Sequence, residues 1–388
     1  MTGVVVGGVV ANKHRSGGSA WVRMSWAEAL RDAGFDVLFV EQIEEAACVD
    51  AAGRPAPFER SANLAAFRAV TAQFGFAGSA ALVCPDGSRV EGMAQDDLLA
   101  RAADAQLLVN LGGHLRWPPL LARLPRRAFV DLDPGFTQLW HAEGRDVGLE
   151  GHDLHFTVGV NVGTPRCALP TGGLDWRPIR QPVVLDRWPW AEDDADPPGF
   201  TTVASWRGAY GPLEWQGRTL GVKAHEFRRF LALPTRVNAA FELALQIHPG
   251  DERDAERLRR HRWRLLGPDA VSTPDAFRRF IQRSGAEFSA AQGVYVETRS
   301  GWFSDRTARY LASGRPALVQ DTGFGDDLAA GEGLIGFHTL DEAVAGARDI
   351  AADYGRHRAA ARRIAEEHFA AERALAPLLE AAGLAVHA

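Results

Sequence analysis

The sequence predicts an α/β protein made of two consecutive halves, each built on a parallel sheet with helices between its strands. Short apolar runs, the form taken by strands buried on both faces, alternate with segments of helical periodicity along the chain. The alternation breaks once, between Trp176 and Gly199, in a stretch with five prolines and a cluster of acids, and then restarts. A chain of 388 residues is long enough for two domains.

The first half opens with a strand predicted over Val4–Val10, which has no polar interruption. A loop over residues 11–18 leads to a helix over Ser19–Ala33, which stops at Gly34, and a strand over Asp36–Val40 follows. This β-loop-α-β unit predicts parallel strands. The same patterns predict strands over Gln106–Leu111, Ala128–Asp131 and Phe156–Val160, and helices over Ala62–Thr71, Gln95–Ala103 and Pro118–Leu124.

The second half restarts with a strand over Thr201–Ser205. Apolar runs predict further strands over Phe241–Ile247, Val294–Glu297, Ala317–Val319 and Leu334–Phe337. Amphipathic periodicity predicts helices over Asp254–His261, Pro274–Gln282 and Ser304–Ser313, and two closing helices over Leu340–Asp353 and His357–Ala371.

Composition favours a cytoplasmic globular protein. Hydrophobic residues make up 46% of the chain and charged residues 24%, and a net charge of −6 argues against a general nucleic-acid binder. Three cysteines without metal-ligand spacing are expected to be reduced thiols. The run Val4–Val10 is too short to span a bilayer, and basic residues follow it, the reverse of a secretory signal. We therefore expect no integral membrane segment.

Lysine is rare in this sequence. Of the 43 basic residues only Lys13 and Lys223 are lysines. A chain that uses arginine for ordinary surface charge leaves each lysine as a candidate for a specific role as a compact point charge. Chance survival of the two residues explains the count equally well.

The most specific motif lies between Ser300 and Asp327. A Ser300-Gly301 turn precedes a helix that begins near Ser304, and the following strand ends in the polar loop Gln320–Gly323. A helix N-terminus exposes unpaired N–H groups and attracts anions. Arg306 in the first turn opposes the helix dipole by roughly 0.3–1 kcal/mol, so an anionic ligand would explain its position. The loop lies where open α/β sheets bind ligands, beyond the carboxyl ends of the strands.

This segment resembles the donor half of GT-B glycosyltransferases, enzymes with two Rossmann-like α/β/α domains that face each other across a cleft. The resemblance rests on four segments: Ser300-Gly301, the helix from Ser304, the run Leu311–Pro316 and the loop Asp321–Phe324. It is specific over Ser300–Phe324 and a matter of pattern for residues 1–190. One departure is Arg309, at the position where many relatives carry a Glu that binds the ribose. Ribose recognition would then fall to Asp305 or Glu297.

The resemblance implies an acceptor-binding domain over residues 1–190, a donor-binding domain over 191–355, and a C-terminal helix over 356–388 that packs back on the first domain. It implies transfer of a sugar from a nucleoside diphosphate sugar to a small-molecule or glycan acceptor, without a bound metal or other cofactor. The implied donor-binding residues are Arg207, Lys223, Ser300, Gly301, Ser304, Asp305, Arg306, Asp321, Thr322 and Gly323.

Two basic residues of that set, Arg207 and Lys223, lie outside the motif around Ser304. Arg207 and Lys223 would approach the diphosphate from the loop after the first strand of the second half, with Arg228 a weaker candidate. Surface ion pairing explains Arg207 equally well and Arg228 better. Trp206 could stack on a base, but a tryptophan at a strand end is more often part of the core.

The resemblance also implies a catalytic base. Inverting GT-B enzymes place a His after the first strand, here His14, oriented by an Asp for which Asp131 and Asp133 are candidates. A solvated His in a basic loop is the alternative. Gly17-Gly18 is a weak candidate for a phosphate cradle. The loop Asn110–His114 could line the acceptor pocket.

His152 and His155 lack a third ligand for zinc, so a structural role is favoured for them. The charged run 251–264 is most simply a solvated helix face.

Two other functions stay open at this point, and a third is disfavoured. A non-hydrolysing nucleotide-sugar epimerase would have a similar fold and diphosphate site, but no acceptor. A catalytically silent sugar-nucleotide binder is conceivable because Arg309 replaces the usual Glu. An NAD-dependent oxidoreductase is disfavoured, since no complete glycine fingerprint with a following acid is present. The sequence does not determine the donor sugar, the nucleotide base of the donor, the acceptor or the stereochemical outcome.

Overall fold

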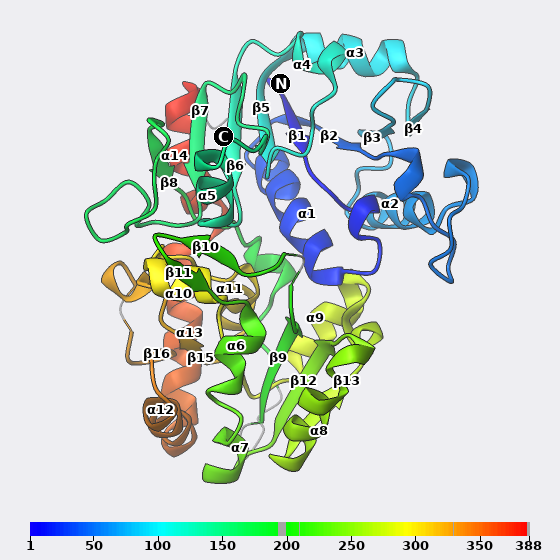
Figure 1. The fold of residues 1–388 in the computed structure, drawn as a ribbon. Helices are drawn as coiled ribbons and strands as arrows, with labels where there is room; N and C mark the ends of the chain where they lie inside the picture. Colours follow the sequence, from blue (N-terminus) through cyan, green and yellow to red (C-terminus); the bar gives the residue numbers. More distant parts are fainter. Residues whose placement is uncertain (193–198, 209, 329, 386–388) are drawn as a thin grey trace.

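The computed structural model describes residues 1–192, 199–208, 210–328 and 330–385. They form two large sheets, and Figure 1 shows the first half of the chain above the second. The first sheet has eight strands in the order β4-β3-β2-β1-β5-β6-β7-β8, all paired in parallel except β3 with β4. Its strands are β1 (Gly3–Gly7), β2 (Asp36–Gln42), β3 (Ala80–Val83), β4 (Val90–Glu91), β5 (Ala105–Leu111), β6 (Arg127–Asp131), β7 (Leu154–Thr157) and β8 (Trp176–Pro178).

The second sheet is parallel throughout and has six strands in the order β13-β12-β9-β14-β15-β16. They are β9 (Phe200–Ser205), β12 (Phe241–Gln246), β13 (Trp263–Leu266), β14 (Ala286–Ser289), β15 (Ala317–Gln320) and β16 (Leu334–Phe337). A small antiparallel pair, β10 (Leu213–Trp215) and β11 (Arg218–Leu220), stands apart from it. Two parallel sheets with intervening helices are the predicted fold class.

Helices connect the strands in both halves. The first half contains α1 (Gly17–Asp32), α2 (Ala62–Gln73), α3 (Gln95–Asp104), α4 (Pro118–Leu121) and α5 (Phe136–Ala142). The second contains α6 (Lys223–Arg228), α7 (Leu233–Arg236), α8 (Glu252–Arg260), α9 (Pro274–Gln282), α10 (Gly293–Thr298), α11 (Asp305–Ala312) and α12 (Leu340–Ala352). The chain then forms α13 (Tyr354–His368) and α14 (Ala371–Ala382).

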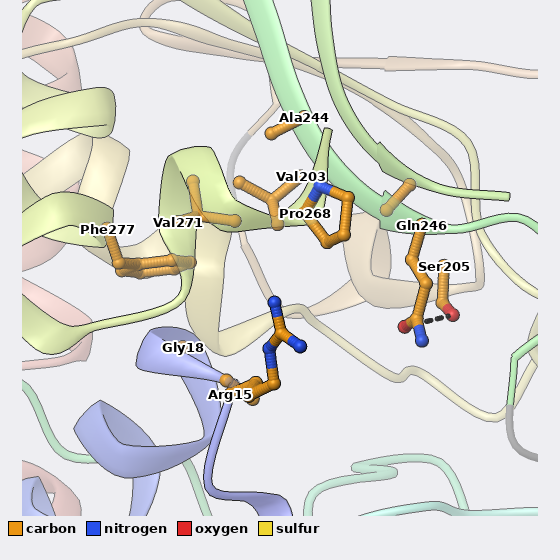
Figure 2. A pocket seen from close by; sticks show the side chains of 11 residues that line it. Arg15, Gly18, Val203, Ser205, Ala244, Gln246, Pro268, Val271 and Phe277 are labelled. Atoms are coloured by element: carbon orange, nitrogen blue, oxygen red, sulfur yellow. Dashed lines mark hydrogen bonds between the residues drawn. The ribbon is translucent and has the colours of Figure 1, made fainter. Parts of the chain in front are cut away.

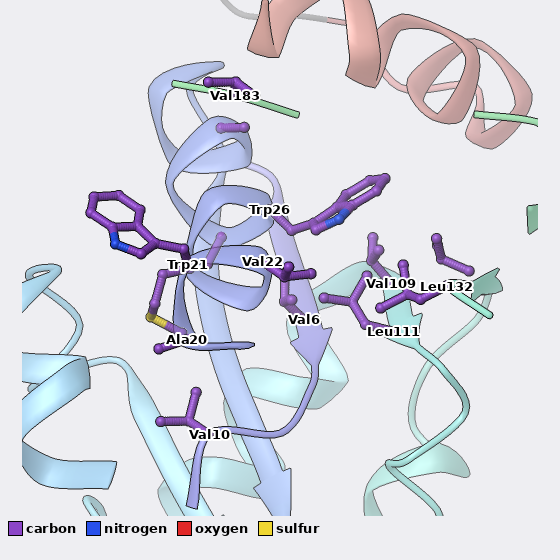
Figure 3. Close-up of a cluster of buried hydrophobic side chains, with 14 of the residues drawn as sticks. Val6, Val10, Ala20, Trp21, Val22, Trp26, Val109, Leu111, Leu132 and Val183 are labelled. Atoms are coloured by element: carbon purple, nitrogen blue, oxygen red, sulfur yellow. The ribbon is translucent and has the colours of Figure 1, made fainter. Parts of the chain in front are cut away.

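Helix α1 lies at the centre of the molecule. Its Trp21 and Trp26 are at most 2% exposed, and Figure 3 shows them on different sides of the helix, with Val6 of β1 and Val109 of β5 nearby. Helix α1 also contacts α9 of the second half and the C-terminal α14. A helix that is covered on all sides can be apolar all round. This burial explains why α1 carries more apolar residues than the single face read from the sequence.

One predicted strand is wrong. Val294–Glu297 lies in the helix α10, in which Val294, Tyr295 and Thr298 are buried. The strand of this part of the sheet is β14, which begins seven residues before α10. The β-branched residues of the run favour a strand, but packing of the helical face overrides that preference. Strand β14 was not predicted; it has only four residues.

The chain changes sheets between β8, which ends at Pro178, and β9, which begins at Phe200. The predicted connection over 176–199 includes residues 193–198, which lie outside the described part of the chain. The C-terminal helix α14 contacts α1 and β7 of the first half, and Arg126 donates to the carbonyl of Ala382 at 2.7 Å. The boundary at residue 190 stays a prediction.

Candidate active site

Each sheet has a topological switch point, where the chain builds strands outward in both directions. In the first sheet it lies between β1 and β5, and in the second between β9 and β14. The loops at the carboxyl ends of the strands meet between the halves, because a cavity of about 170 Å³ is lined from both. Open α/β sheets bind ligands at such points. The candidate active site is therefore this junction.

The 170 Å³ cavity is shown in Figure 2. Val203 and Ser205 of β9, Gln246 of β12 and Phe277 of α9 line it from the second half, and Arg15 and Gly18 from the first. Ser205 donates to the Gln246 side chain at 3.1 Å, and Arg15 pairs with Asp269 at 2.5 Å. The walls are thus mostly apolar, with an amide and a hydroxyl at the end of the strands.

A buried ion pair joins the strands at the second switch point. Arg306 at the start of α11 donates through Nε to Glu287 Oε1 at 2.6 Å, and through its terminal nitrogens to Val203 O at 2.8 Å and Ser289 Oγ at 2.7 Å. The Glu287 side chain is completely buried and that of Arg306 is 12% exposed. The pair with Glu287 explains the position of Arg306 against the helix dipole without an anionic ligand, and a role of Arg306 in donor binding stays a prediction.

Lys223 lies beside this pair. It is the first residue of α6, and its Nζ donates to the carbonyl of Ala290, the residue that follows β14, at 2.9 Å. Burial and the neighbouring Arg306 cation lower the pKa of Lys223 to about 7, and Glu287 opposes this shift. None of the ion pairs among the described residues includes Lys223. Its charge is thus poorly balanced, which an anionic ligand would correct.

The N-terminus of α11 lies next to the same residues. Ser304 is its N-cap, and no side-chain hydrogen bond caps the first turn. Ser304 and Thr307 line a narrow cavity of about 10 Å³ with Ser289 and Gln320, space for about one water molecule. The predicted helix start at Ser304 is confirmed, and its first-turn N–H groups remain available to an anion.

The Ser300-Gly301 turn and the Asp321–Gly323 loop do lie together, but their backbone groups are already engaged. Gly301 N donates to Thr322 O at 2.8 Å, while Asn161, from the first half, donates through its backbone to Ser300 O at 3.1 Å and through its side chain to Gly323 O at 3.0 Å. Gly301 has φ of +73°, and a Cβ there would lie 2.7 Å from Val160 Cγ2. In this arrangement the turn joins the two halves.

Two acids of the predicted donor site already have partners. Asp305 accepts from Arg309 at 2.8 Å, and Arg309, whose side chain is 1% exposed, also donates to Ser25 of α1 at 3.2 Å. Asp321 accepts from Gly323 N at 2.9 Å and lies 3.4 Å from His338 Nε2. Arg309 therefore replaces a ribose-binding Glu with a contact between the halves. Glu297, the other ribose candidate, pairs with Arg218 at 2.5 Å.

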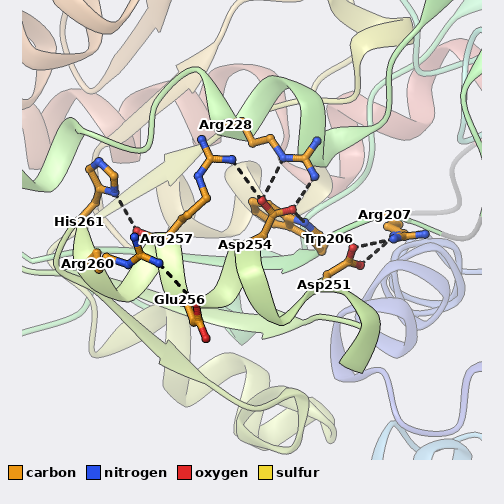
Figure 4. A network of polar contacts seen from close by, with 9 residues as sticks. All are labelled: Trp206, Arg207, Arg228, Asp251, Asp254, Glu256, Arg257, Arg260 and His261. Carbon is orange, nitrogen blue, oxygen red and sulfur yellow. Dashed lines mark hydrogen bonds and ion pairs between the residues drawn. The ribbon is translucent and has the colours of Figure 1, made fainter.

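Arg207 and Arg228 belong to a separate polar network, shown in Figure 4. Arg207 binds both oxygens of Asp251, at 2.7 and 2.6 Å, and Arg228 binds Asp254 at 3.2 and 2.5 Å. Trp206 is 1% exposed and donates to Asp254 at 3.0 Å. The pair with Asp251, in which the Arg207 side chain is 64% exposed, agrees with the surface ion-pair interpretation of Arg207. The charged run of α8 continues this network, for example through Arg260 and Glu256 at 3.4 Å.

Among the described residues, His14 forms no hydrogen bond with Asp131 or Asp133, the two partners that were predicted for it. His14 Nδ1 lies 3.4 Å from the side-chain amide of Asn63, and Asp131 is buried, with Thr137, Gln138 and Thr157 donating to it. Asp131 is thus a structural residue of the loop after β6. Burial and the Arg15 cation lower the pKa of His14.

Asp133, in contrast, is exposed between the halves. Its Oδ1 accepts from the hydroxyl of Tyr295 of α10 at 3.0 Å, and its charge acts on Lys13 and Arg23 of the first half. Lys13, rather than His14, is therefore the basic residue near Asp133. Sequence reasoning missed Tyr295 because the run around it was assigned to a strand, and Arg23 because it lies within the apolar face of α1.

The remaining candidates have structural roles. Gly17 and Gly18 allow α1 to approach the second half, since a Cβ at Gly17 would lie 2.2 Å from Thr273 O. His152 lies 3.1 Å from the side chain of Asn110, and His155 contacts the ring of Trp176. Within the described ranges no group of three metal-ligating side chains is found. None of the described helices combines the length and the apolar composition that a bilayer crossing requires.

The Arg306→Ala variant should lose stability. Removing the guanidinium leaves Glu287 charged and unpaired in a dry environment, which costs about 3–5 kcal/mol. Urea unfolding should show this loss, while Arg260→Ala, a matched change in an exposed pair, should shift the unfolding free energy by less than about 0.5 kcal/mol. Equal stabilities of the two variants would contradict the structural role of Arg306.

Comparisons with known proteins bear on the fold. No family model matches the chain, and no curated protein matches it in sequence. Similar solved structures include an alpha-glucosyltransferase in complex with UDP and a 13-mer DNA, at 10% identity and a TM-score of 0.61, with 99% of this chain and 100% of that chain covered. Anabaena HepE in complex with UDP-glucose has 11% identity and a TM-score of 0.59, with coverage of 99% and 100%. Sucrose-phosphate synthase from Thermosynechococcus elongatus has 13% identity and a TM-score of 0.55, with 98% of each chain covered.

At such identities the likeness is one of fold, and it extends over nearly the whole length of all the chains. Two parallel sheets, opposed switch points and a shared cavity between the halves agree with it. The chain therefore has the GT-B fold of the glycosyltransferases, as the motif around α11 predicted.

Proposed function

We propose that the protein is a glycosyltransferase that moves a sugar from a nucleoside diphosphate sugar to a hydroxyl of an acceptor. One observation carries the proposal. The unpaired Lys223 and the uncapped N-terminus of α11 meet at the second switch point, which also borders the 170 Å³ cavity through Val203. HepE and the alpha-glucosyltransferase, which share the fold, were solved with UDP-glucose and UDP. A donor in the second half fits both.

The diphosphate would lie between Lys223 and the first turn of α11, near Ser304. A lysine supplies a point charge and the helix N-terminus supplies N–H donors, and both are strongest for the charge that develops on a leaving diphosphate. Arg306 would not need to touch the diphosphate. Its pair with Glu287 would instead hold the N-terminus of α11 in place. Ser300, Gly301, Asp321, Thr322 and Gly323 would shape the sugar side of the site after the halves separate.

The nucleoside would occupy the 170 Å³ cavity. Its apolar walls, with Phe277 and Val203, suit a flat base, and Gln246 offers an amide that both donates and accepts. The cavity is smaller than a typical ligand pocket, and the 10 Å³ space at Ser304 is smaller still. Entry of the donor therefore requires the halves to open, which hinge motion in two-domain enzymes provides.

The acceptor would bind on the first half, with Asp133 as its general base. A hydroxyl is a weak nucleophile until its proton is removed, and Asp133 is an exposed carboxylate near the junction. The Tyr295 hydroxyl, which donates to Asp133 at 3.0 Å, would hold the carboxylate in place. We also propose a cytoplasmic setting, in which the three buried free cysteines stay reduced, and leaving-group stabilisation by protein groups in place of a metal.

The first test compares the two lysines of the chain. Lys223→Met should weaken the binding of UDP by about 1.5–3 kcal/mol, roughly ten- to a hundredfold in Kd, because it removes a charge-assisted contact to the diphosphate. Lys13→Met should leave UDP affinity nearly unchanged, since Lys13 belongs to the first half. Isothermal titration calorimetry measures both. Equal affinities of Lys223→Met and the unchanged protein would place the diphosphate elsewhere.

Binding should also be linked to protons. The pKa of Lys223 is about 7 in the free protein, and a bound diphosphate should raise it by favouring the charged form. At pH 8 free Lys223 is mostly neutral, so UDP binding should take up a proton, and affinity should fall as the pH rises above 7. Calorimetry in two buffers of different ionisation enthalpy measures the uptake. Lys223→Arg, which stays charged, should show none, and an unchanged uptake in that variant would contradict the assignment.

A transfer assay tests the activity itself. Radiolabelled nucleotide sugars and a cell extract should yield a labelled product, and Asp133→Asn should lower the rate by about 10²–10⁴-fold without changing UDP affinity. Asp175→Asn, at a side chain 81% exposed, is the matched control. A changed sugar without transfer would indicate the epimerase, and donor binding with neither product would indicate a silent binder. A normal rate in Asp133→Asn would remove Asp133 as the base.

A further inference from the structure

A second cavity, of about 270 Å³, lies at the switch point of the first sheet. It is lined by residues that follow β1, β2 and β5, among them Lys13, Gln42 and His114. The other lining residues are Val9, Asn12 and Glu44. The predicted loop Asn110–His114 thus contributes His114 to this cavity. The two lysines of the chain therefore lie at the two switch points, one in each half.

A buried carboxylate fixes the loop that carries Lys13. Glu41 of β2 is completely buried and accepts from the backbone N–H groups of Val10, Ala11 and Asn12 at 2.7, 2.7 and 2.8 Å. The Asn12 side chain adds a fourth bond at 2.9 Å. With four donors the charge of Glu41 is satisfied locally. It holds the loop in place and is not a counter-ion for Lys13.

Arg23 is a buried cation near this cavity and has few partners. Its side chain is 8% exposed, NH1 donates to Ser19 Oγ at 3.1 Å, and Nε has no hydrogen-bond partner. Neither Lys13 nor Arg23 takes part in the ion pairs found among the described residues, which include most of the arginines around the site. A buried guanidinium without a carboxylate at hydrogen-bond distance is costly unless a ligand supplies the anion.

The electrostatic environment shows that these cations converge. Burial, together with Arg23, Lys13 and Arg116, lowers the pKa of His114 to about 3, so this imidazole is neutral and available as a hydrogen-bonding group. Burial and Arg23 also lower the pKa of Lys13. Of these cations, Arg116 is paired, with Asp146 at 2.7 Å. Lys13 and Arg23 are the ones left for a ligand.

The acids that face these cations have other partners or are exposed to solvent. Asp133 acts on both Lys13 and Arg23 from beyond ion-pair distance and accepts from Tyr295. Asp305, which also faces Arg23, is held by Arg309. Glu44 lines the cavity and, like Lys13, is exposed, and no ion pair joins the two among the described residues. Glu41 also acts on Arg23, but its oxygens already accept four hydrogen bonds. A further anion would balance the charge that these acids leave.

We propose that this cavity binds an anionic group of the acceptor, a phosphate or a carboxylate, through Lys13 and Arg23, with an acceptor hydroxyl directed to Asp133. The inference rests on the proposed function and specifies its substrate class. A neutral acceptor would leave two cations unpaired beside the reacting hydroxyl. An anionic acceptor pairs them and is oriented by them, since the anion site and Asp133 lie on the same side of the junction.

The scarcity of lysine makes a direct test practical. Reductive methylation of the full-length protein with ¹³C-formaldehyde labels only Lys13, Lys223 and the terminal amine and keeps their charge, and Lys13→Arg and Lys223→Arg assign the NMR signals. UDP is titrated first. Inorganic phosphate, glycerol 3-phosphate and neutral glycerol are then titrated at constant ionic strength, with and without saturating UDP.

UDP should shift the Lys223 signal and leave Lys13 unmoved. Phosphate and glycerol 3-phosphate should shift the Lys13 signal in the UDP complex, and glycerol should not. Arg23→Gln should weaken that phosphate response by about tenfold or more, the loss expected for one charge-assisted contact. Because Arg23 is buried, Lys13→Met serves as the second variant, with glycerol 3-phosphate affinity measured by calorimetry. Asp175→Asn is the control and should bind as the unchanged protein does.

A Lys13 signal that no anion shifts, or that glycerol shifts equally, would overturn the inference. A Lys13 shift caused by UDP alone would also overturn it, because the anion would then belong to the donor. A Lys223 signal that ignores UDP would contradict the donor site instead. The Lys13 response is still informative in that case, since it is recorded without UDP as well.

Discussion

The buried pair of Glu287 and Arg306 is the interaction on which the candidate site depends. A carboxylate with no exposed surface at the switch point of the second sheet needs a partner, and Arg306 supplies it while also binding the carbonyl of Val203. The pair fixes the start of α11 against β9 and β14. It also places a second cation beside Lys223. Burial and this cation lower the pKa of the lysine, and an anion would offset both effects.

Several contacts join the two halves at the candidate site. Arg309 reaches Ser25 of α1, and Asn161 binds the predicted donor loop at Gly323, so both contacts join the two halves. Gly17 permits the closest approach, against Thr273. These polar contacts can be exchanged for contacts with a ligand when the halves separate. An interface of this kind is compatible with the hinge motion that the small cavities require.

The sequence predicted what depends on local pattern. The alternation of strands and helices, the start of α11 at Ser304 and the two parallel sheets follow from periodicity and from turn residues, which act over a few positions. Partnerships between distant residues were not predictable, such as Glu287 with Arg306 or Asn161 with Gly323. The strand predicted over Val294–Glu297 failed for the same reason, because packing decided its conformation. The rarity of lysine was a compositional signal for both switch points, because Lys13 follows β1 and Lys223 binds the carbonyl of the residue after β14.

The most direct test of the donor site is a crystal structure of the full chain with UDP. The account predicts that the β-phosphate lies within about 3 Å of Lys223 Nζ and of first-turn N–H groups of α11, with the base in the cavity near Gln246 and Phe277. The Glu287–Arg306 pair should be unchanged, because it positions the helix. A diphosphate bound beside Lys13, or beside Arg207 and away from α11, would contradict the account.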